Sequence, residues 1–160
     1  MRIWKISAGE QSIHWRRFVA EDVAAFGAWD EGSFRNYKTR DDLFKKLKSY
    51  SLKKWGKSTT SHVEAWNFYE EVDIGDLMVL YRKGGVVAIG VVTGDYEYDE
   101  SKVWNGEKYF HVRSVKWKLL DPSNRKISND LKKNLSVPPD TIHEIKDRMD
   151  ITEILRLVLF

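Results

Sequence analysis

Positively charged side chains crowd into one stretch of this chain. Residues 35–57 hold nine Lys or Arg and two acids, a local charge of +7, which leaves −4 for the rest of a protein with a net charge of +3. A positive patch on an otherwise mildly acidic protein suits a polyanion bound on one face. Lysines along a helix also occur as a merely solvated face, and composition alone leaves both readings open. The candidates for phosphate contacts are Arg35, Lys38, Arg40, Lys45, Lys57, Arg113 and Lys116.

Aromatic side chains are the second group that could serve binding. Seven tryptophans exceed what a core of this size needs, and surplus rings near basic residues suit stacking on nucleic-acid bases. The loop of residues 94–108 contains Tyr96, Tyr98 and Trp104, and long aromatic loops beside a sheet are typical functional sites. Four other tryptophans fall at periodic apolar positions and are expected in the core: Trp4, Trp15, Trp66 and Trp117.

The residue patterns of most enzymes and metal sites are missing from the sequence. There is no cysteine, and the four histidines show no ligand spacing, so we expect neither a metal nor a cofactor. Gly27 and Gly32 have the glycine spacing of a P-loop, but no lysine follows. An acidic nuclease centre could be built from Asp95, Asp99 and Glu100, although a Glu-x-Lys partner on a strand is lacking. A small nuclease or RNA-modifying enzyme therefore stays an alternative.

Length and hydropathy narrow the class of protein further. With 160 residues, the chain has material for one compact core, which favours a single domain. No stretch approaches the roughly 20 apolar residues that span a bilayer, and the N-terminus lacks the apolar run of a signal peptide. We therefore expect a soluble, cytoplasmic protein without a membrane partner.

Residue periodicity indicates which elements must position these side chains. Strand-like runs are expected at residues 2–7, 23–29, 76–82, 86–93 and 109–119. Helices are expected at residues 11–21, after the start signal at residues 39–42, at residues 62–72, and from residue 141 or 150 to the end. Residues 124–134 read as a polar segment.

Taken in order, these segments resemble the EVE/PUA-like N-terminal domains of McrB-type, GTP-dependent restriction proteins and their standalone relatives. The matching segments are residues 4–15 (WKISAGEQSIHW), 23–34 (VAAFGAWDEGSF), 65–99, 111–117 (HVRSVKW) and 140–145 (DTIHEI). Order and spacing carry the resemblance, because each segment alone is degenerate. It implies an α+β fold in which a small, strongly curved β-barrel is flanked by helices. It further implies that residues 1–160 form one reader domain, the N-terminal part of a longer McrB-like chain.

Within the PUA-like class, YTH domains are similar in arrangement and read N6-methyladenine with tryptophans. The resemblance places Trp29, after the second strand, and Trp104, in the long loop, as two walls of a pocket, with Tyr96 and Tyr98 beside Trp104. For polar contacts to the base we favour Asp30 and the loop containing Ser7 and Gln11. Asp30 could instead cap its turn, and Trp29 could instead belong to the core.

These residues together suggest a modified-base reader rather than an enzyme. The resemblance implies the specificity domain of a modification-dependent restriction system, which flips a methylated base of duplex DNA into an aromatic pocket. We favour N6-methyladenine over a 5-modified cytosine because of the two tryptophans. The implied protein partners are a GTPase domain of the same chain and a McrC-like nuclease subunit. An RNA reader of the PUA/YTH kind is the alternative.

Overall fold

A curled sheet forms the centre of the molecule. The computed structural model describes residues 1–27, 30–56, 61–136 and 141–159. The strand order in the large sheet is β2-β8-β4-β3-β1-β9, with β5 also paired to β8, while β6 and β7 form a separate hairpin. The strands are β1 (Ile3–Ile6), β2 (Val23–Phe26), β3 (Leu77–Arg82), β4 (Gly85–Val92), β5 (Glu97–Tyr98), β6 (Val103–Trp104), β7 (Glu107–Lys108), β8 (His111–Leu119) and β9 (Ile142–Glu144).

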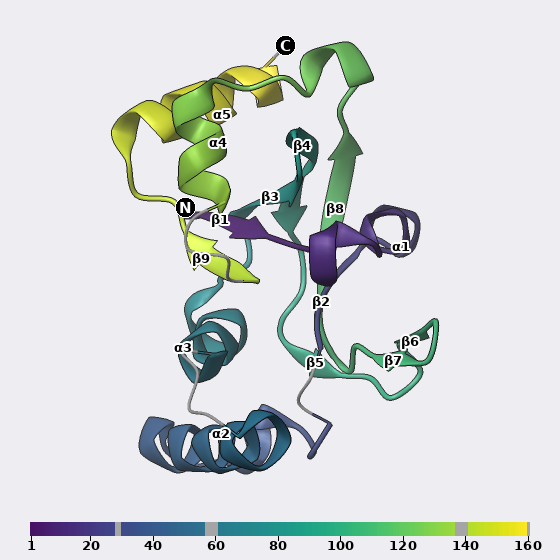
Figure 1. The fold of residues 1–160 in the computed structure, drawn as a ribbon, viewed down its shortest axis with the longest axis vertical. Helices are drawn as coiled ribbons and strands as arrows, with labels where there is room; N and C mark the ends of the chain where they lie inside the picture. Colours follow the sequence, from purple (N-terminus) through teal and green to yellow (C-terminus); the bar gives the residue numbers. More distant parts are fainter. Residues whose placement is uncertain (28–29, 57–60, 137–140, 160) are drawn as a thin grey trace.

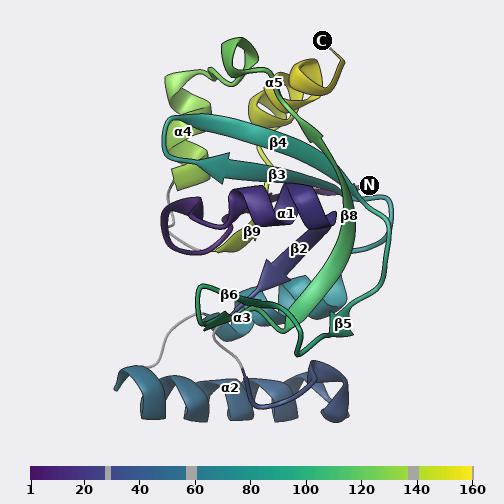
Figure 2. The ribbon, with the colours of Figure 1, turned by 90° about the vertical axis from the view of Figure 1, so that its right-hand side faces the viewer.

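Helices flank this sheet at both ends. Figures 1 and 2 show α4 and α5 at one end of the molecule and α2 at the other, with the curl of the sheet visible in Figure 2. The helices are α1 (Trp15–Glu21), α2 (Arg40–Trp55), α3 (Ser61–Trp66), α4 (Asn129–Ser136) and α5 (Arg148–Leu159). Single turns are η1 (Glu10–Ser12), η2 (Phe34–Asn36), η4 (Pro122–Asn124) and the π-helical η3 (Asn67–Glu71) that extends α3. The expected α+β fold, a strongly curved sheet flanked by helices, is confirmed.

The inner strands β1 and β3 are buried on both faces of the sheet. Because side chains alternate along a strand, Trp4 of β1 joins a cluster with Phe18 and Phe26, whereas its neighbour Ile3 joins a second cluster with Leu131 of α4. β1 pairs in parallel with β3 and antiparallel with β9. The first strand thus lies inside the sheet, where both of its faces are covered.

Helix α2 forms for reasons visible in its sequence. The Thr39 hydroxyl accepts a hydrogen bond from the Asp42 backbone N–H at 3.1 Å, and Gly56 closes the helix with a φ of 67°. Leu43, Leu47 and Tyr50 face the core at helical spacing. The expected helix after residues 39–42 is confirmed. Within the described residues no helix could cross a membrane, by length and hydropathy together.

Three expected elements differ from the structure. Helix α1 begins at Trp15 rather than near Gln11, because Gln11 and Ser12 both have φ near 53°, which ends any right-handed helix there. The segment expected to be merely polar contains α4, whose Leu131 and Leu135 lie one turn apart and are buried. The tail beyond residue 141 first adds β9 to the sheet and only then forms α5.

Candidate functional site

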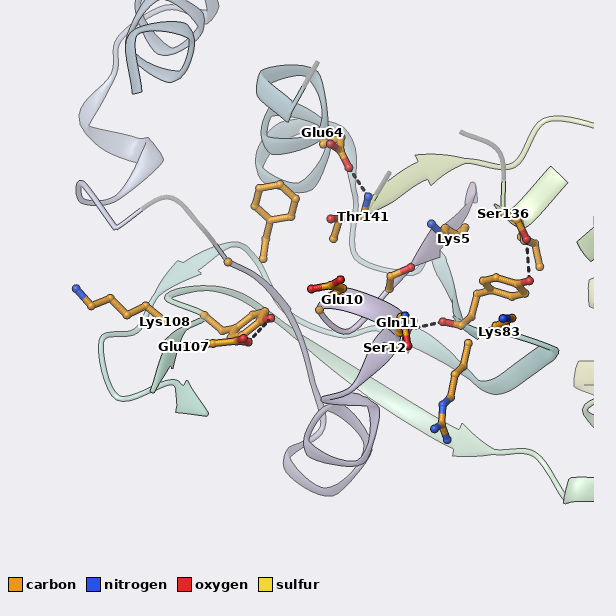
Figure 3. Close-up of a pocket in the computed structure, with 18 of the residues that line it drawn as sticks. Lys5, Glu10, Gln11, Ser12, Glu64, Lys83, Glu107, Lys108, Ser136 and Thr141 are labelled. Carbon is orange, nitrogen blue, oxygen red and sulfur yellow. Dashed lines mark hydrogen bonds between the residues drawn. The ribbon is translucent and has the colours of Figure 1, made fainter. Parts of the chain in front are cut away.

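A cleft with a volume of about 990 Å³ opens beside the sheet, and we call it the central cleft (Figure 3). It lies between the end of β1, the η1 turn, the end of β2, the β3–β4 turn, the β6–β7 hairpin and the ends of α2 and α4. The lining residues are Lys5, Ser7, Gly9, Glu10, Gln11, Ser12, Phe26, Gly27, Asp30, Lys54, Glu64, Tyr81, Arg82, Lys83, Gly106, Glu107, Lys108, Tyr109, Leu135, Ser136 and Thr141.

An aromatic ring, that of Tyr109, forms part of one end of the cleft. Its hydroxyl donates to Glu107 Oε2 at 3.1 Å, and burial raises the pKa of Tyr109 well above its usual value. Behind it, Trp104 stacks with centroids 5.0 Å apart and planes at 26°. A Cβ added to Gly9 would lie 2.5 Å from the Tyr109 hydroxyl, and one added to Gly27 would lie 3.1 Å from its ring. Glycine at both positions lets the backbone pass close to this ring.

Two carboxylates at the same end are held in fixed positions. Glu107 pairs through Oε2 with His14 Nε2 at 2.7 Å, and this contact lowers the pKa of Glu107. Asp30 accepts from Lys108 Nζ at 2.9 Å and from the Tyr50 hydroxyl at 3.0 Å. The Lys108 bond is the main cause of the lowered pKa of Asp30. Both carboxylates are therefore ionised acceptors near neutral pH.

The turn between β1 and α1 forms the middle of the cleft wall. Figure 3 shows Glu10, Gln11 and Ser12 between the Glu107 end and the Lys83 end. The Ser12 hydroxyl accepts from the Ala8 backbone N–H at 3.1 Å and donates to the Tyr81 carbonyl. Ser12 therefore fastens the turn to β3, which leaves the exposed Gln11 side chain at the cleft.

The structure brings together three of the residues expected to contact a base. Ser7, Gln11 and Asp30 all line the central cleft. Trp29, the expected first wall of the pocket, lies outside the described residues, although Gly27 on one side and Asp30 on the other both line the cleft.

The rings expected from the long loop lie elsewhere, which corrects their placement. Trp104 is 4% exposed and packs into the core, and Tyr96 is 1% exposed. The Tyr96 hydroxyl lies 2.6 Å from His111 Nδ1 and accepts from the Phe34 backbone N–H at 3.0 Å, while burial raises its pKa to about 12. Tyr98 is half-buried and packs against Phe110. None of the three lines the cleft: Tyr96 and Trp104 are buried in the core cluster that contains Trp4, and Tyr98 lies on β5, which pairs with β8.

The basic residues expected to contact phosphate fall into two groups. Arg113 is buried and its guanidinium donates to the carbonyls of Phe68, Tyr69 and Gly94 at 2.7, 2.6 and 3.3 Å, so it cannot reach a phosphate at the surface. This corrects the expectation for Arg113. Lys57 falls outside the described residues. The other candidates are exposed and lie outside the cleft: Arg35, Lys38, Arg40, Lys45 and Lys116.

Several lining residues escaped the sequence analysis. The sequence pattern assigns Tyr109 and Arg82 to strands without a binding role and gives no role to Lys83, whereas all three line the cleft. The available signal was two adjacent cations directly before Gly84 and Gly85, which marks a charged hairpin tip. Of the acidic residues considered for a nuclease, Asp99 accepts from the Ser101 backbone N–H and hydroxyl at 2.9 and 2.6 Å, a local turn contact.

Comparison with solved structures identifies the fold. The chain is similar to the crystal structure of the YTH domain of the Zygosaccharomyces rouxii MRB1 protein in complex with N6-methyladenosine RNA, with a TM-score of 0.51 and 14% sequence identity. The similarity covers 99% of this chain and 85% of that one. The fold is therefore YTH-like.

Comparison of sequences places the chain in a family. No curated protein matches it. The model of one family matches residues 4–146, which is most of the chain. The chain therefore belongs to the family described as a domain of unknown function (DUF8426).

Proposed function

We propose that this chain is a reader of a methylated base in nucleic acid, a binding domain and not an enzyme. The observation that carries the proposal is the Tyr109 end of the central cleft, where an aromatic ring backed by the core lies in one cavity with Ser7, Gln11 and Asp30. Its YTH-like fold supports the same function, since the similar solved domain is bound to N6-methyladenosine RNA.

The energetics of such a site require aromatic walls. A base must leave the duplex or come from a single strand, and extrusion costs a few kcal/mol. Each ring that stacks on the base returns roughly 1–3 kcal/mol. We assign one wall to Tyr109 and keep Trp29 as the second, because its described neighbours Gly27 and Asp30 both line the cleft. Two walls then about balance the cost of extrusion.

Polar groups must supply the identity of the base. Asp30 and Glu107 present ionised carboxylates whose positions are fixed by Lys108 and His14. A carboxylate accepts hydrogen bonds, so it favours a base edge that carries an amino or ring N–H donor. Gln11 adds an amide that can both donate and accept. Contact with the methyl group itself is worth roughly 1–3 kcal/mol.

Affinity comes mainly from cations outside the cleft. Lys45, Arg40 and Lys38 are exposed on or just before α2, and Arg35 and Lys116 are exposed elsewhere on the surface. Contacts of this kind bind phosphates without regard to sequence and weaken as salt rises. We therefore separate the residues that select the base from those that hold the backbone.

The biological partner follows from the resemblance to McrB-type proteins. We propose that residues 1–160 are one domain at the N-terminal part of a longer McrB-like chain with a GTPase domain and a McrC-like nuclease partner. Its ligand would then be duplex DNA with a methylated base, N6-methyladenine before 5-modified cytosine. A reader of methylated RNA is the second candidate, which the solved YTH complex favours.

A titration panel tests the proposal. Matched duplex DNA, single-stranded DNA and RNA would carry N6-methyladenine, 5-methylcytosine, 5-hydroxymethylcytosine or no modification, and binding would be followed by fluorescence anisotropy. We expect Trp29→Ala to abolish the preference for the modified base and to spare weak nonspecific binding, whereas Lys45→Ala weakens both alike. Equal loss of both affinities in a folded Trp29→Ala protein would reject Trp29 as a wall. Absence of any preference in the wild type would reject the reader.

A further inference from the structure

The central cleft is larger than one base needs. Its volume of about 990 Å³ is at the upper end of the roughly 300–1,000 Å³ of pockets that hold a drug-sized ligand. In Figure 3, Glu107 and Lys108 lie at one end, Lys83 and Ser136 lie at the other, and the η1 turn lies between them. The cleft thus has a second end, at Tyr81, that a single bound base at Tyr109 would not fill.

The second end differs from the first in charge. The basic lining residues here are Lys5, Arg82 and Lys83. Two further carboxylates also line the cleft, Glu10 on the η1 turn and Glu64, whose Oε1 accepts from the backbone N–H groups of Thr141 and Ile142. Arg82 and Lys83 are exposed, and Lys5 lies deeper, with 3% of its surface exposed. The carboxylates of the Tyr109 end are held by their own partners there, Glu107 by His14 and Asp30 by Lys108. An anionic group is therefore favoured at the Tyr81 end.

The walls of this end are built into the fold. Tyr81 Oη lies 2.8 Å from Ser136 Oγ of α4, and the Tyr81 carbonyl accepts from the Ser12 hydroxyl. A bulge interrupts the β3–β4 register between Leu80 and Tyr81, and such bulges re-aim side chains. Hydrogen bonds therefore hold both the hydroxyl and the backbone carbonyl of Tyr81.

The tip that carries the two exposed cations is also anchored. The Val86 backbone N–H donates to the Arg125 carbonyl at 3.3 Å, and a Cβ on Gly85 would lie 2.3 Å from the same oxygen. The β3–β4 tip is therefore held against residue 125. The backbone that carries Arg82 and Lys83 therefore needs little rearrangement to meet a ligand, which lowers the entropic cost of binding.

We propose that the Tyr81 end is a second nucleotide subsite, which holds the phosphodiester and the neighbouring nucleoside of the base bound at the Tyr109 end. Arg82 and Lys83 contact the phosphate, and the Tyr81 ring gives the neighbouring base a surface to stack on. The inference rests on the proposed reader function and names its minimal ligand, a dinucleotide step.

Short ligands test this subsite apart from the rest of the surface. The probes are the nucleosides of N6-methyladenine and 5-methylcytosine, and their dinucleotides with thymidine on the 5′ or the 3′ side, with a phosphate or an uncharged methylphosphonate linkage. Affinities are measured by isothermal titration calorimetry. We expect one phosphate-linked dinucleotide to bind about tenfold or more tightly than its nucleoside, the effect of one charge-assisted contact.

Two double variants locate the gain. Arg82→Ala with Lys83→Ala should remove the advantage of the dinucleotide and leave nucleoside affinity unchanged, as should the methylphosphonate linkage in the wild type. The matched control is Lys126→Ala with Lys133→Ala, which removes two exposed cations that neither line the cleft nor belong to the proposed phosphate contacts. It should keep the full advantage.

The outcomes separate this inference from the function on which it rests. Nucleoside binding without a dinucleotide advantage, or an advantage that survives Arg82→Ala with Lys83→Ala, overturns the second subsite and leaves the reader standing. If the wild type binds neither nucleosides nor the longer methylated nucleic acids, both are overturned. Tyr81→Leu, checked for folding by circular dichroism, should reduce the advantage of the dinucleotide over its nucleoside; an unchanged advantage would remove Tyr81 from the subsite.

Discussion

Trp104 stacks on Tyr109 with ring centroids 5.0 Å apart, so a buried tryptophan supports the ring that reaches the central cleft. Trp104 also packs on Phe18 at 5.7 Å and on His14 at the same distance. His14 in turn holds Glu107, which accepts from Tyr109. The aromatic wall and the carboxylate beside it therefore share one support.

Removing the Trp104 ring should lower the stability of the fold. We expect Trp104→Ala to lower the free energy of unfolding by about 3–5 kcal/mol, the usual effect of emptying a large aromatic site in a core. Urea unfolding followed by circular dichroism measures it, and Trp104→Phe, which keeps a ring, should lose less. Wild-type stability in Trp104→Ala would contradict the stack as a core contact.

Alanine at Gly9 should disturb the cleft. Its φ of 81° already strains an alanine, by roughly 1 kcal/mol or more, and the new Cβ would lie 2.5 Å from the Tyr109 hydroxyl. Gly75→Ala is the control, because φ there is 94° and nothing lies within 4 Å of the new Cβ. We expect Gly9→Ala to be the less stable of the two and to bind the methylated base more weakly, whereas Gly75→Ala binds as the wild type does. Equal effects would show that Tyr109 tolerates the contact.

Methionine substitutions of Arg113 and Lys116 should have opposite effects on stability and on the salt dependence of binding, although both residues lie on β8. Arg113→Met leaves backbone carbonyls of Phe68 and Tyr69 without a donor, at a cost of about 1–3 kcal/mol in unfolding free energy. Lys116→Met, at an exposed position, should leave stability unchanged and, if Lys116 meets a phosphate, lower the slope of log affinity against log salt by about one. A reduced salt slope in a fully stable Arg113→Met protein would contradict its structural role.

Stability should depend on pH through Asp76. Its buried carboxylate accepts from the backbone N–H groups of Arg2 and Asp73 and from Trp4 Nε1, at 2.8, 3.0 and 2.9 Å. Burial alone would raise the pKa of Asp76, but these hydrogen bonds outweigh it and the pKa is lowered. The folded state therefore binds fewer protons than the unfolded one, so this contribution to stability is complete above the usual Asp pKa of 3.8 and is lost as pH falls through the lower pKa of the folded state.

Asp76→Asn checks this dependence. We expect it to lower the unfolding free energy by roughly 1–3 kcal/mol at neutral pH and to flatten the acid side of the stability curve, measured by urea titration between about pH 3 and 7. Asp121→Asn is the control, since Asp121 also has a lowered pKa, caused first by its Ser123 bond, but is exposed. An acid limb as steep in Asp76→Asn as in the wild type would contradict the assignment.

The main strands and α2 could be predicted because local patterns determine them. Residues 76–82, 86–93 and 109–119 carry β-branched and aromatic runs, and Thr39 marks the start of α2. Helix α4 escaped because only Leu131 and Leu135 of an otherwise polar segment are buried. β9 escaped because three residues hold too little pattern, and its pairing with β1 is set by tertiary packing.

The site was predicted in part, and the limit has a physical cause. Ser7 and Gln11 lie in the loop after β1, Asp30 lies shortly after β2, and all three line the cleft. Which aromatic ring reaches the cleft depends on how the long loop folds back, and there Trp104 packs inward while Tyr109 lines the cavity. No local pattern encodes that choice.

The place of β1 in the sheet has a consequence for biosynthesis. β1 pairs with residues 77–80 of β3 and with residues 142–144 of β9. The strand that carries Lys5 and leads into Ser7 can therefore pair only after these distant segments have been synthesised. Such long-range pairing slows folding, because loop closure must precede the contacts that reward it. A nascent chain still lacking β9 has an open edge on β1 and an unfinished cleft wall. The cleft wall at β1 is therefore complete only after β9 has left the ribosome, and until then that edge is open to aggregation.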